Sequence, residues 1–149
     1  MKVFPRLVLG VGVVLGVLQF VPLGRHGENP PVRAEPPWPS AESRALAVRA
    51  CFDCHSNETK WPWYTNVAPV SWLAVHDVDE GRAALNFSEW NRPQKEAHEA
   101  AEELLEGEMP MVIYLPLHPK ALLSTAEKKT LADAFTTMFS GGGHGDDDD

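Results

Sequence analysis

The two cysteines of the chain, Cys51 and Cys54, stand three residues apart, and His55 follows the second one directly. We expect a helix that is capped by Ser40 and runs through residues 41–54, where this spacing projects both thiols to the same side. The chain has 149 residues, of which 44% are hydrophobic. Such a chain builds a small core, so a large bound group would supply much of the surface that the fold buries.

Four kinds of site use a cysteine pair of this type. A disulfide would close a very short loop and leave His55 without a role. A structural zinc site needs four protein ligands, and the chain has no second cysteine pair. A thioredoxin-like pair accompanies a βαβ pattern, which the sequence lacks. In haem c attachment both sulfurs form thioethers and the histidine binds the iron, so we predict one covalently attached haem c held by Cys51 and Cys54, with His55 as proximal ligand.

Iron in an electron carrier needs a second axial ligand, and the sequence offers a methionine in a suitable place. Met109 lies between Gly107 and Pro110, which interrupt regular structure on both sides, so a loop can bring the thioether over the porphyrin. The adjacent proline restricts this loop and lowers the entropy lost when the sulfur binds. We therefore predict Met109 as the distal ligand. The other candidates are Met111, His76, His98 and His118.

Aromatic residues crowd the segment that follows the cysteine motif. They are Trp61, Trp63, Tyr64 and Trp72. Their rings are broad and apolar, and their N–H and O–H groups can donate to carboxylates. We expect them to pack against the haem or to contact its propionates, with ordinary core packing as the alternative.

Three blocks of the chain together resemble a known family. They are "CFDCHSNETKWPWYTNVAPVSWLAVHDVDEGRAALNFSEW", "EGEMP" and "LHPKALLSTAEKKTLADAF". Over about residues 40–139 they are similar to the membrane-anchored bacterial haem-binding domain family, a branch of the monohaem, class-I-like c-type cytochromes. The resemblance implies haem binding and electron transfer. It also implies that a proline carbonyl accepts the Nδ1 proton of His55, and Pro69 is the matching residue.

Charge and proline content divide the ends of the chain into segments. An uncharged apolar run follows Lys2 and Arg6, which predicts a transmembrane signal anchor over residues 1–23, with a cleaved signal peptide as the alternative. Both interpretations export everything that follows. Residues 24–39 are rich in proline, and we expect them to form a stiff, extended linker. Residues 141–149 contain four aspartates and no apolar side chain, which predicts a disordered acidic tail.

Residues 40–140 are predicted to form one all-α, cytochrome c-like domain around the haem. Helix signals recur through this region, and no stretch alternates with period two. After the helix that ends in the cysteine motif, a second helix is expected to begin at a Ser71 cap. A third runs from Pro93 to Gly107, and a fourth begins with a capping box at Ser124–Glu127.

The formal net charge of −8 argues against a nucleic-acid partner. We predict a one-electron carrier rather than an enzyme, anchored by a single pass in the bacterial cytoplasmic membrane with its haem domain in the periplasm. Its partners would be redox proteins at the membrane, and the negative surface favours positively charged docking patches. Two alternatives stay open. One is a peroxidase-like haem enzyme or a gas or redox sensor with a displaceable sixth ligand, and the other is an interaction module with structural haem.

Overall fold

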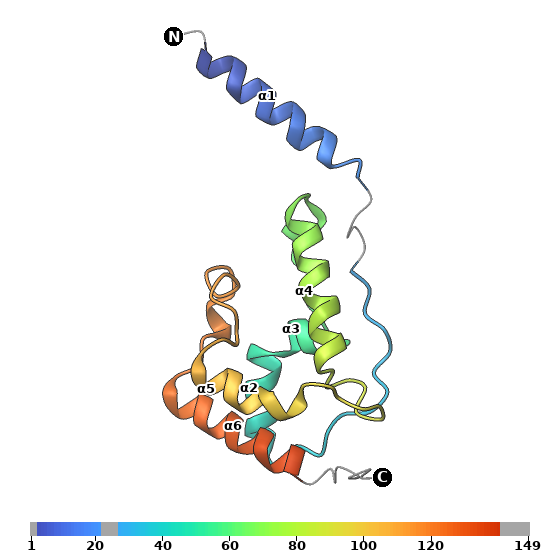
Figure 1. Ribbon diagram of the computed structural model, residues 1–149, viewed down its shortest axis with the longest axis vertical. Helices are drawn as coiled ribbons and strands as arrows, with labels where there is room; N and C mark the ends of the chain where they lie inside the picture. The colour runs from blue at the N-terminus through green and yellow to red at the C-terminus, as the bar shows by residue number, and fades with distance from the viewer. Residues whose placement is uncertain (1–2, 22–26, 141–149) are drawn as a thin grey trace, which may run out of the picture.

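The computed structural model describes residues 3–21 and 27–140, which form helices joined by extended segments and turns (Figure 1). The described residues contain no β-strand and a single isolated bridge, between Ala34 and Glu89. The all-helical fold class predicted from the sequence is therefore confirmed. In chain order the helices are α1 (Val3–Leu18), α2 (Ala41–Ala50), α3 (Phe52–His55), η1 (Trp63–Asn66), α4 (Val70–Ala84), η2 (Ala97–Glu99), α5 (Ala100–Glu106), η3 (Pro119–Ala121) and α6 (Thr125–Ser140).

Side-chain caps fix two of the predicted helix starts. At α2 the Oγ atom of Ser40 accepts the backbone N–H of Ser43 at 3.0 Å, and the Ser40 N–H donates back to the Ser43 hydroxyl. At α6 the Ser124 N–H donates to the Glu127 carboxylate at 2.8 Å, and the Glu127 N–H donates to the Ser124 hydroxyl. These reciprocal bonds satisfy N–H groups that a helix start leaves without partners, and both predictions are confirmed.

Two other predicted starts are wrong. Helix α4 begins at Val70, because the N–H of Ser71 already donates to the carbonyl of Val67 and lies inside the first turn. The helix expected from Pro93 begins only at Ala97, with the short helix η2 that leads directly into α5. The residues before it are held as a loop by the side chain of Gln94, which accepts the N–H of Asn86 at 2.8 Å and donates to the carbonyl of Glu89. The predicted end is correct, because a glycine with a φ of 89° terminates α5 at residue 107.

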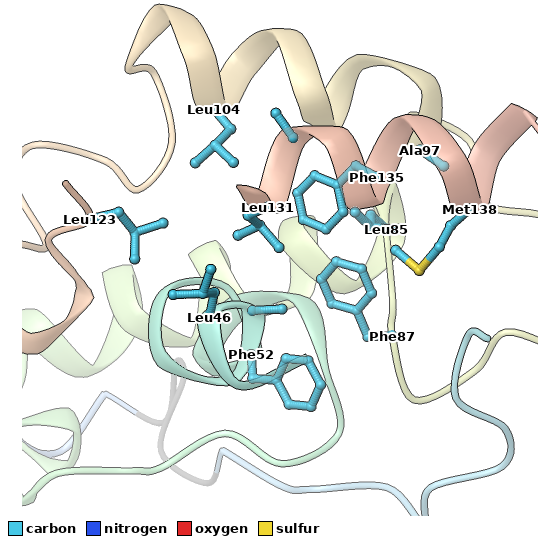
Figure 2. Close-up of a cluster of buried hydrophobic side chains, with 12 residues drawn as sticks. Leu46, Phe52, Leu85, Phe87, Ala97, Leu104, Leu123, Leu131, Phe135 and Met138 are labelled. Carbon is cyan, nitrogen blue, oxygen red and sulfur yellow. The ribbon is translucent and has the colours of Figure 1, made fainter. Parts of the chain in front are cut away.

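The apolar core lies where α6 packs against α5 and α2 (Figure 2). Phe87 is fully buried at its centre, and its ring stacks on Phe52 at 5.6 Å and on Phe135 at 5.8 Å between centroids. The other buried members come from α2, η2, α5 and α6 and from the residues next to α4 and α6. They are Leu46, Ala47, Leu85, Ala97, Leu104, Leu123, Leu131, Ala132 and Met138.

The proline-rich segment that precedes α2 is extended, as predicted, but it lies along the domain. The carbonyl of Ala34 accepts the backbone N–H of Trp90 at 2.9 Å, and Glu35 forms an ion pair with Arg44 at 2.6 Å. The ring of Trp38 packs against the core. The described part of the predicted linker therefore lies against the domain, because its backbone and side chains find partners on Trp90 and Arg44.

Helix α1 contains 16 residues and ends at Leu18, where the chain turns. In the described ranges no helix combines the length and the apolar character that crossing a membrane requires, so the predicted transmembrane helix over residues 1–23 is not borne out. The side chain of Gln19 fastens the end of α1 to the domain through two 3.0 Å hydrogen bonds with the backbone of Ala68. The first two and the last two residues of the predicted anchor, and the predicted acidic tail, lie outside the described residues.

Candidate functional site

A cavity of about 490 Å³ lies beside the cysteine motif. This volume is within the range of about 300–1,000 Å³ that is usual for small-molecule and cofactor sites. The cavity is lined by residues of α2 to α6 and by the loop that follows α5. Its apolar lining includes Leu85, Phe87, Leu104 and Phe135. Segments far apart in the sequence thus meet around one partly apolar space.

His55 enters this cavity from the end of α3, and its ring is oriented by two backbone carbonyls. Nδ1 lies 2.9 Å from the oxygen of Gly81 and 3.1 Å from that of Leu85. Because both partners can only accept, Nδ1 carries the ring proton and Nε2 keeps its lone pair. Burial lowers the pKa of His55, while the carbonyls of Leu85 and Gly81 act in the opposite direction. The neutral ring therefore presents a nitrogen that can bind a metal.

The predicted role of Pro69 is wrong. Its carbonyl accepts the backbone N–H of Trp72 at 3.1 Å in the first turn of α4, while the proton of His55 goes to the other end of that helix. The acceptors are thus carbonyls at the C-terminal end of α4. The carbonyl of Gly81 also accepts the backbone N–H of Leu85 at 2.9 Å, and Leu85 itself follows the last residue of the helix. A carbonyl oxygen has two lone pairs, so the Gly81 oxygen can accept both donors.

Cys51 and Cys54 also line the cavity, and both are free thiols. The short helix α3 places them there, because the N–H groups of Cys54 and His55 both donate to the carbonyl of Cys51. Burial raises the pKa of Cys51 to about 12, and burial together with Asp77 and Asp53 raises that of Cys54 to about 11. The thiols therefore stay protonated, which is unfavourable for zinc binding or thiolate redox chemistry. Over residues 3–21 and 27–140 no group of three or more His, Cys, Asp or Glu side chains is placed to hold a metal ion.

Helix α4 approaches the motif so closely that residue 81 has no room for a side chain. A Cβ atom on Gly81 would lie 2.7 Å from the carbonyl oxygen of Cys54 and 3.1 Å from its Cβ. The same close approach brings the Gly81 carbonyl to the ring of His55. Sequence reasoning missed this residue, although a glycine in the middle of a predicted helix is a recognised sign of close packing.

The five candidate distal ligands separate into two groups. Met109, Met111 and His76 line the cavity. His98 is not among the lining residues and pairs with the adjacent Glu99 at 3.5 Å. His118 does not line the cavity either, because its ring stacks on Tyr114. The structure therefore brings the predicted methionine to the same space as His55, together with one other methionine and one histidine.

The four aromatic residues singled out in the sequence do not reach the cavity. Trp61 donates to Asn29 at 3.1 Å, and Trp63 is 78% exposed. Tyr64 bonds to His118 at 2.8 Å, and the indole N–H of Trp72 is buried without a hydrogen-bond partner. The aromatic side chains that line the cavity are Phe87, Tyr114 and Phe135.

Tyr114 is a second residue that sequence reasoning missed. Its hydroxyl donates to Asp53 Oδ2 at 2.6 Å, and the other oxygen of Asp53 accepts the N–H of Lys60 at 3.0 Å. Its ring stacks on that of His118, with centroids 3.7 Å apart and planes 5° apart. Burial and the bond to Asp53 raise the pKa of Tyr114, so the phenol keeps the proton that it donates. Nothing in the local sequence pairs residue 114 with residue 53.

Carboxylates dominate the charged part of the lining. Lys95 is the one lysine or arginine among the described lining residues. The acidic residues are Asp53, Asp77, Glu80, Glu96, Glu99 and Glu103. The site is therefore apolar in part and carries an excess of negative charge.

Comparison with known proteins gives one match. The model of a family described as "Haem-binding domain" matches residues 13–137. No curated protein and no solved structure matches the chain. The matched range includes every residue that lines the cavity. Two protonated thiols, a histidine with a free Nε2 and two thioethers around a partly apolar cavity fit the group that this description names.

Proposed function

Because the chain belongs to the haem-binding domain family, we propose that Cys51 and Cys54 attach one haem c covalently and that the protein is a one-electron carrier. His55 and Met109 would bind its iron. The observation that supports it most directly is the orientation of His55, whose Nδ1 proton is held by two carbonyls while both cysteine thiols line the same cavity. This combination fits c-type attachment, whereas a disulfide would give His55 no role. A structural zinc site would need four protein ligands, and in the described part of the chain no group of three or more His, Cys, Asp or Glu side chains is placed to supply them.

When bound, the haem iron supplies a one-electron redox couple. The role of the polypeptide is to hold the iron ligands in place and to control the access of water. The carbonyls of Gly81 and Leu85 fix the rotation of the His55 ring and increase the basicity of its free nitrogen. Apolar lining residues such as Phe87 and Leu104 limit contact with water, which raises the cost of the extra charge in the ferric state. Both effects suit electron transfer without substrate chemistry.

The choice of Met109 is supported by the elements from which the candidates come. His76 belongs to α4, the helix whose carbonyl at Gly81 holds His55. Met109 and Met111 belong to the loop after α5. Ligands on opposite faces of a porphyrin are most simply supplied by different segments, which favours the methionine loop. Of the two methionines, Met109 lies closer to the glycine that ends α5. Its backbone is held there, because its N–H donates to the carbonyl of Glu103 at 3.2 Å.

We also propose that the protein works outside the cytoplasm, at the membrane, with redox proteins as partners. The uncharged N-terminal run after Lys2 and Arg6 has the composition of an export signal, and haem c attachment of this type takes place on the far side of the bacterial cytoplasmic membrane. Six carboxylates against one lysine around the cavity favour a partner with a positively charged surface and a salt-sensitive association.

Optical spectra and a mass measurement test this function. The intact protein should weigh one haem more than its polypeptide, and its pyridine adduct should have the spectrum of thioether-linked haem. The oxidised protein should show the methionine-to-iron charge-transfer band. Met109→Ala should abolish this band and lower the reduction potential, whereas the matched variant Met111→Ala should retain both. Rapid carbon monoxide binding to the reduced wild type would instead indicate a displaceable ligand and support a haem enzyme or gas sensor.

A further inference from the structure

The loop after α5 is attached to the rest of the domain by few apolar contacts. It begins at Gly107 and extends to His118, and three of its large side chains are exposed: Val112 at 76%, Ile113 at 70% and Leu117 at 66%. A segment that buries so little apolar surface gains little stability from packing. Yet it carries both methionines that line the cavity, so other interactions must hold it in place.

Within this loop Tyr114 makes the contact that reaches the attachment motif. Its hydroxyl lies 2.6 Å from Asp53, which stands between the two cysteines. A short O–H···O⁻ bond of this kind is about twice as strong as a bond between neutral groups. Asp53 is itself fixed by the N–H of Lys60, and both Asp53 and Tyr114 line the cavity. The bond therefore joins the two sides of the cavity.

A second contact supports the tyrosine from behind. His118 stacks on the Tyr114 ring, and its Nδ1 lies 3.1 Å from the Tyr114 carbonyl. Nδ1 is therefore the donor, and Nε2 accepts the hydroxyl of Tyr64 at 2.8 Å. Tyr64 does not line the cavity, so its bond to His118 lies outside the contact between Tyr114 and Asp53.

We propose that the Tyr114–Asp53 hydrogen bond is a latch that keeps the methionine loop closed over the cavity and controls how readily an external ligand displaces the sixth ligand. Tyr114 is a positioning residue in this role, and the proposal rests on methionine ligation from the proposed function. With the latch intact, the loop holds the thioether against displacement. Without it, the loop opens at the side facing the cysteines and the sixth position becomes accessible.

Imidazole is a suitable probe, because it competes with methionine for ferric iron and changes the absorption spectrum. Tyr114→Phe removes the hydroxyl alone, and the loss of a bond to a charged group should tighten imidazole binding roughly tenfold or more. Tyr64→Phe is the matched control, because it removes the only other tyrosine hydroxyl of the chain and leaves the latch in place. Its imidazole dissociation constant should stay within about twofold of the wild-type value.

A double-mutant cycle assigns the effect to the bond. Asp53→Asn removes the charge that strengthens the bond and should also tighten imidazole binding. The double variant with Tyr114→Phe should show little more than the larger single effect, because both substitutions act on the same interaction. Equal imidazole affinities of wild type and Tyr114→Phe would overturn the latch, as would additive effects of the two substitutions. If Tyr114→Phe does not retain haem, the same comparison is made with Asp53→Asn alone.

The two proposals fail in different ways. If methionine ligation is wrong, the wild type lacks the methionine-to-iron band, and Met109→Ala binds imidazole with the same affinity as the wild type. If the latch alone is wrong, the wild type has the band, Met109→Ala loses it, and Tyr114→Phe behaves like the wild type. A pyridine spectrum that is unchanged in every variant confirms that the attachment itself is intact.

Discussion

A single carbon atom added at Gly81 should push the cysteine motif in α3 away from α4, the helix that packs against it. In Gly81→Ala the new Cβ would lie 2.7 Å from the carbonyl oxygen of Cys54. Neither side can avoid the contact by rotating a side chain, because one atom belongs to the backbone of α3 and the other is fixed to α4. The helices must therefore move apart, and the bond from His55 to the Gly81 carbonyl must lengthen from its present 2.9 Å.

Two opposing effects determine how much the free energy of unfolding falls in Gly81→Ala. Overpacking of a tight contact costs about 1–3 kcal/mol, and the backbone contact here favours the upper end of that range. Alanine is a better helix former than glycine by about 1 kcal/mol. The free energy of unfolding should therefore fall by about 2 kcal/mol in Gly81→Ala, the difference between the two effects.

Denaturation of the haem-loaded protein in urea, followed by the haem absorption, measures this difference. Ala74→Gly in the same helix calibrates the propensity effect, because Ala74 does not line the cavity and its replacement should cost about 1 kcal/mol. The methionine-to-iron band and the reduction potential report whether His55 is still oriented. If Gly81→Ala is as stable as the wild type or more stable, the close approach of α4 to the motif is wrong.

Three further predictions concern the helices around the site. Phe87→Ala should lower the free energy of unfolding by about 3–5 kcal/mol, because removal of the buried ring leaves a cavity among stacked neighbours. Urea denaturation measures this loss, and a value under about 1 kcal/mol would contradict the packing. Ser124→Ala should cost about 0.5–2 kcal/mol through loss of the α6 cap, as the same assay shows. Hydrogen bonds from the Ser124 backbone and from Arg49 lower the pKa of Glu127 from 4.5 to about 2. This carboxylate therefore stabilises the fold above pH 4.5, and its contribution is lost as the pH falls towards 2. Glu127→Gln should flatten that part of the curve of unfolding free energy against pH, and an unchanged curve would refute the assignment.

The parts of the molecule that could be predicted are those with a local cause. A serine before an apolar run caps a helix whatever surrounds it, and a glycine ends one by adopting a positive φ, so Ser40, Ser124 and Gly107 behave as expected. The cysteine motif belongs to the same class, because its spacing alone places Cys51 and Cys54 on one side of a turn. Haem binding itself was predicted from this motif, and the family match agrees with it.

The parts that were missed depend on contacts between distant segments. The proline-rich segment reads as a free spacer because nothing in its composition identifies the ladder partner at Trp90 or the ion pair with Arg44. In the same way, the aromatic residues after the motif suit a porphyrin by composition, yet Trp61 is directed to the extended segment by its bond to Asn29. Composition states what a side chain can contact, and tertiary packing decides which partner it finds.

The acceptor for His55 illustrates the limit most clearly. A proline carbonyl is an attractive partner on local grounds, because proline has no N–H of its own and its carbonyl is often free. Here Pro69 precedes the first residue of α4, so its carbonyl accepts the N–H of Trp72 in the first turn. At the other end of this fifteen-residue helix, the carbonyl of Leu85 lies beyond the last turn, and the carbonyl of Gly81 has a second lone pair besides the one that takes the Leu85 N–H. The proton of His55 goes to those carbonyls because Gly81 lets the helix end approach the ring. The sequence places the start of this helix two residues late, with Ser71 as its cap. Such a prediction does not show that the C-terminal end of the helix orients His55.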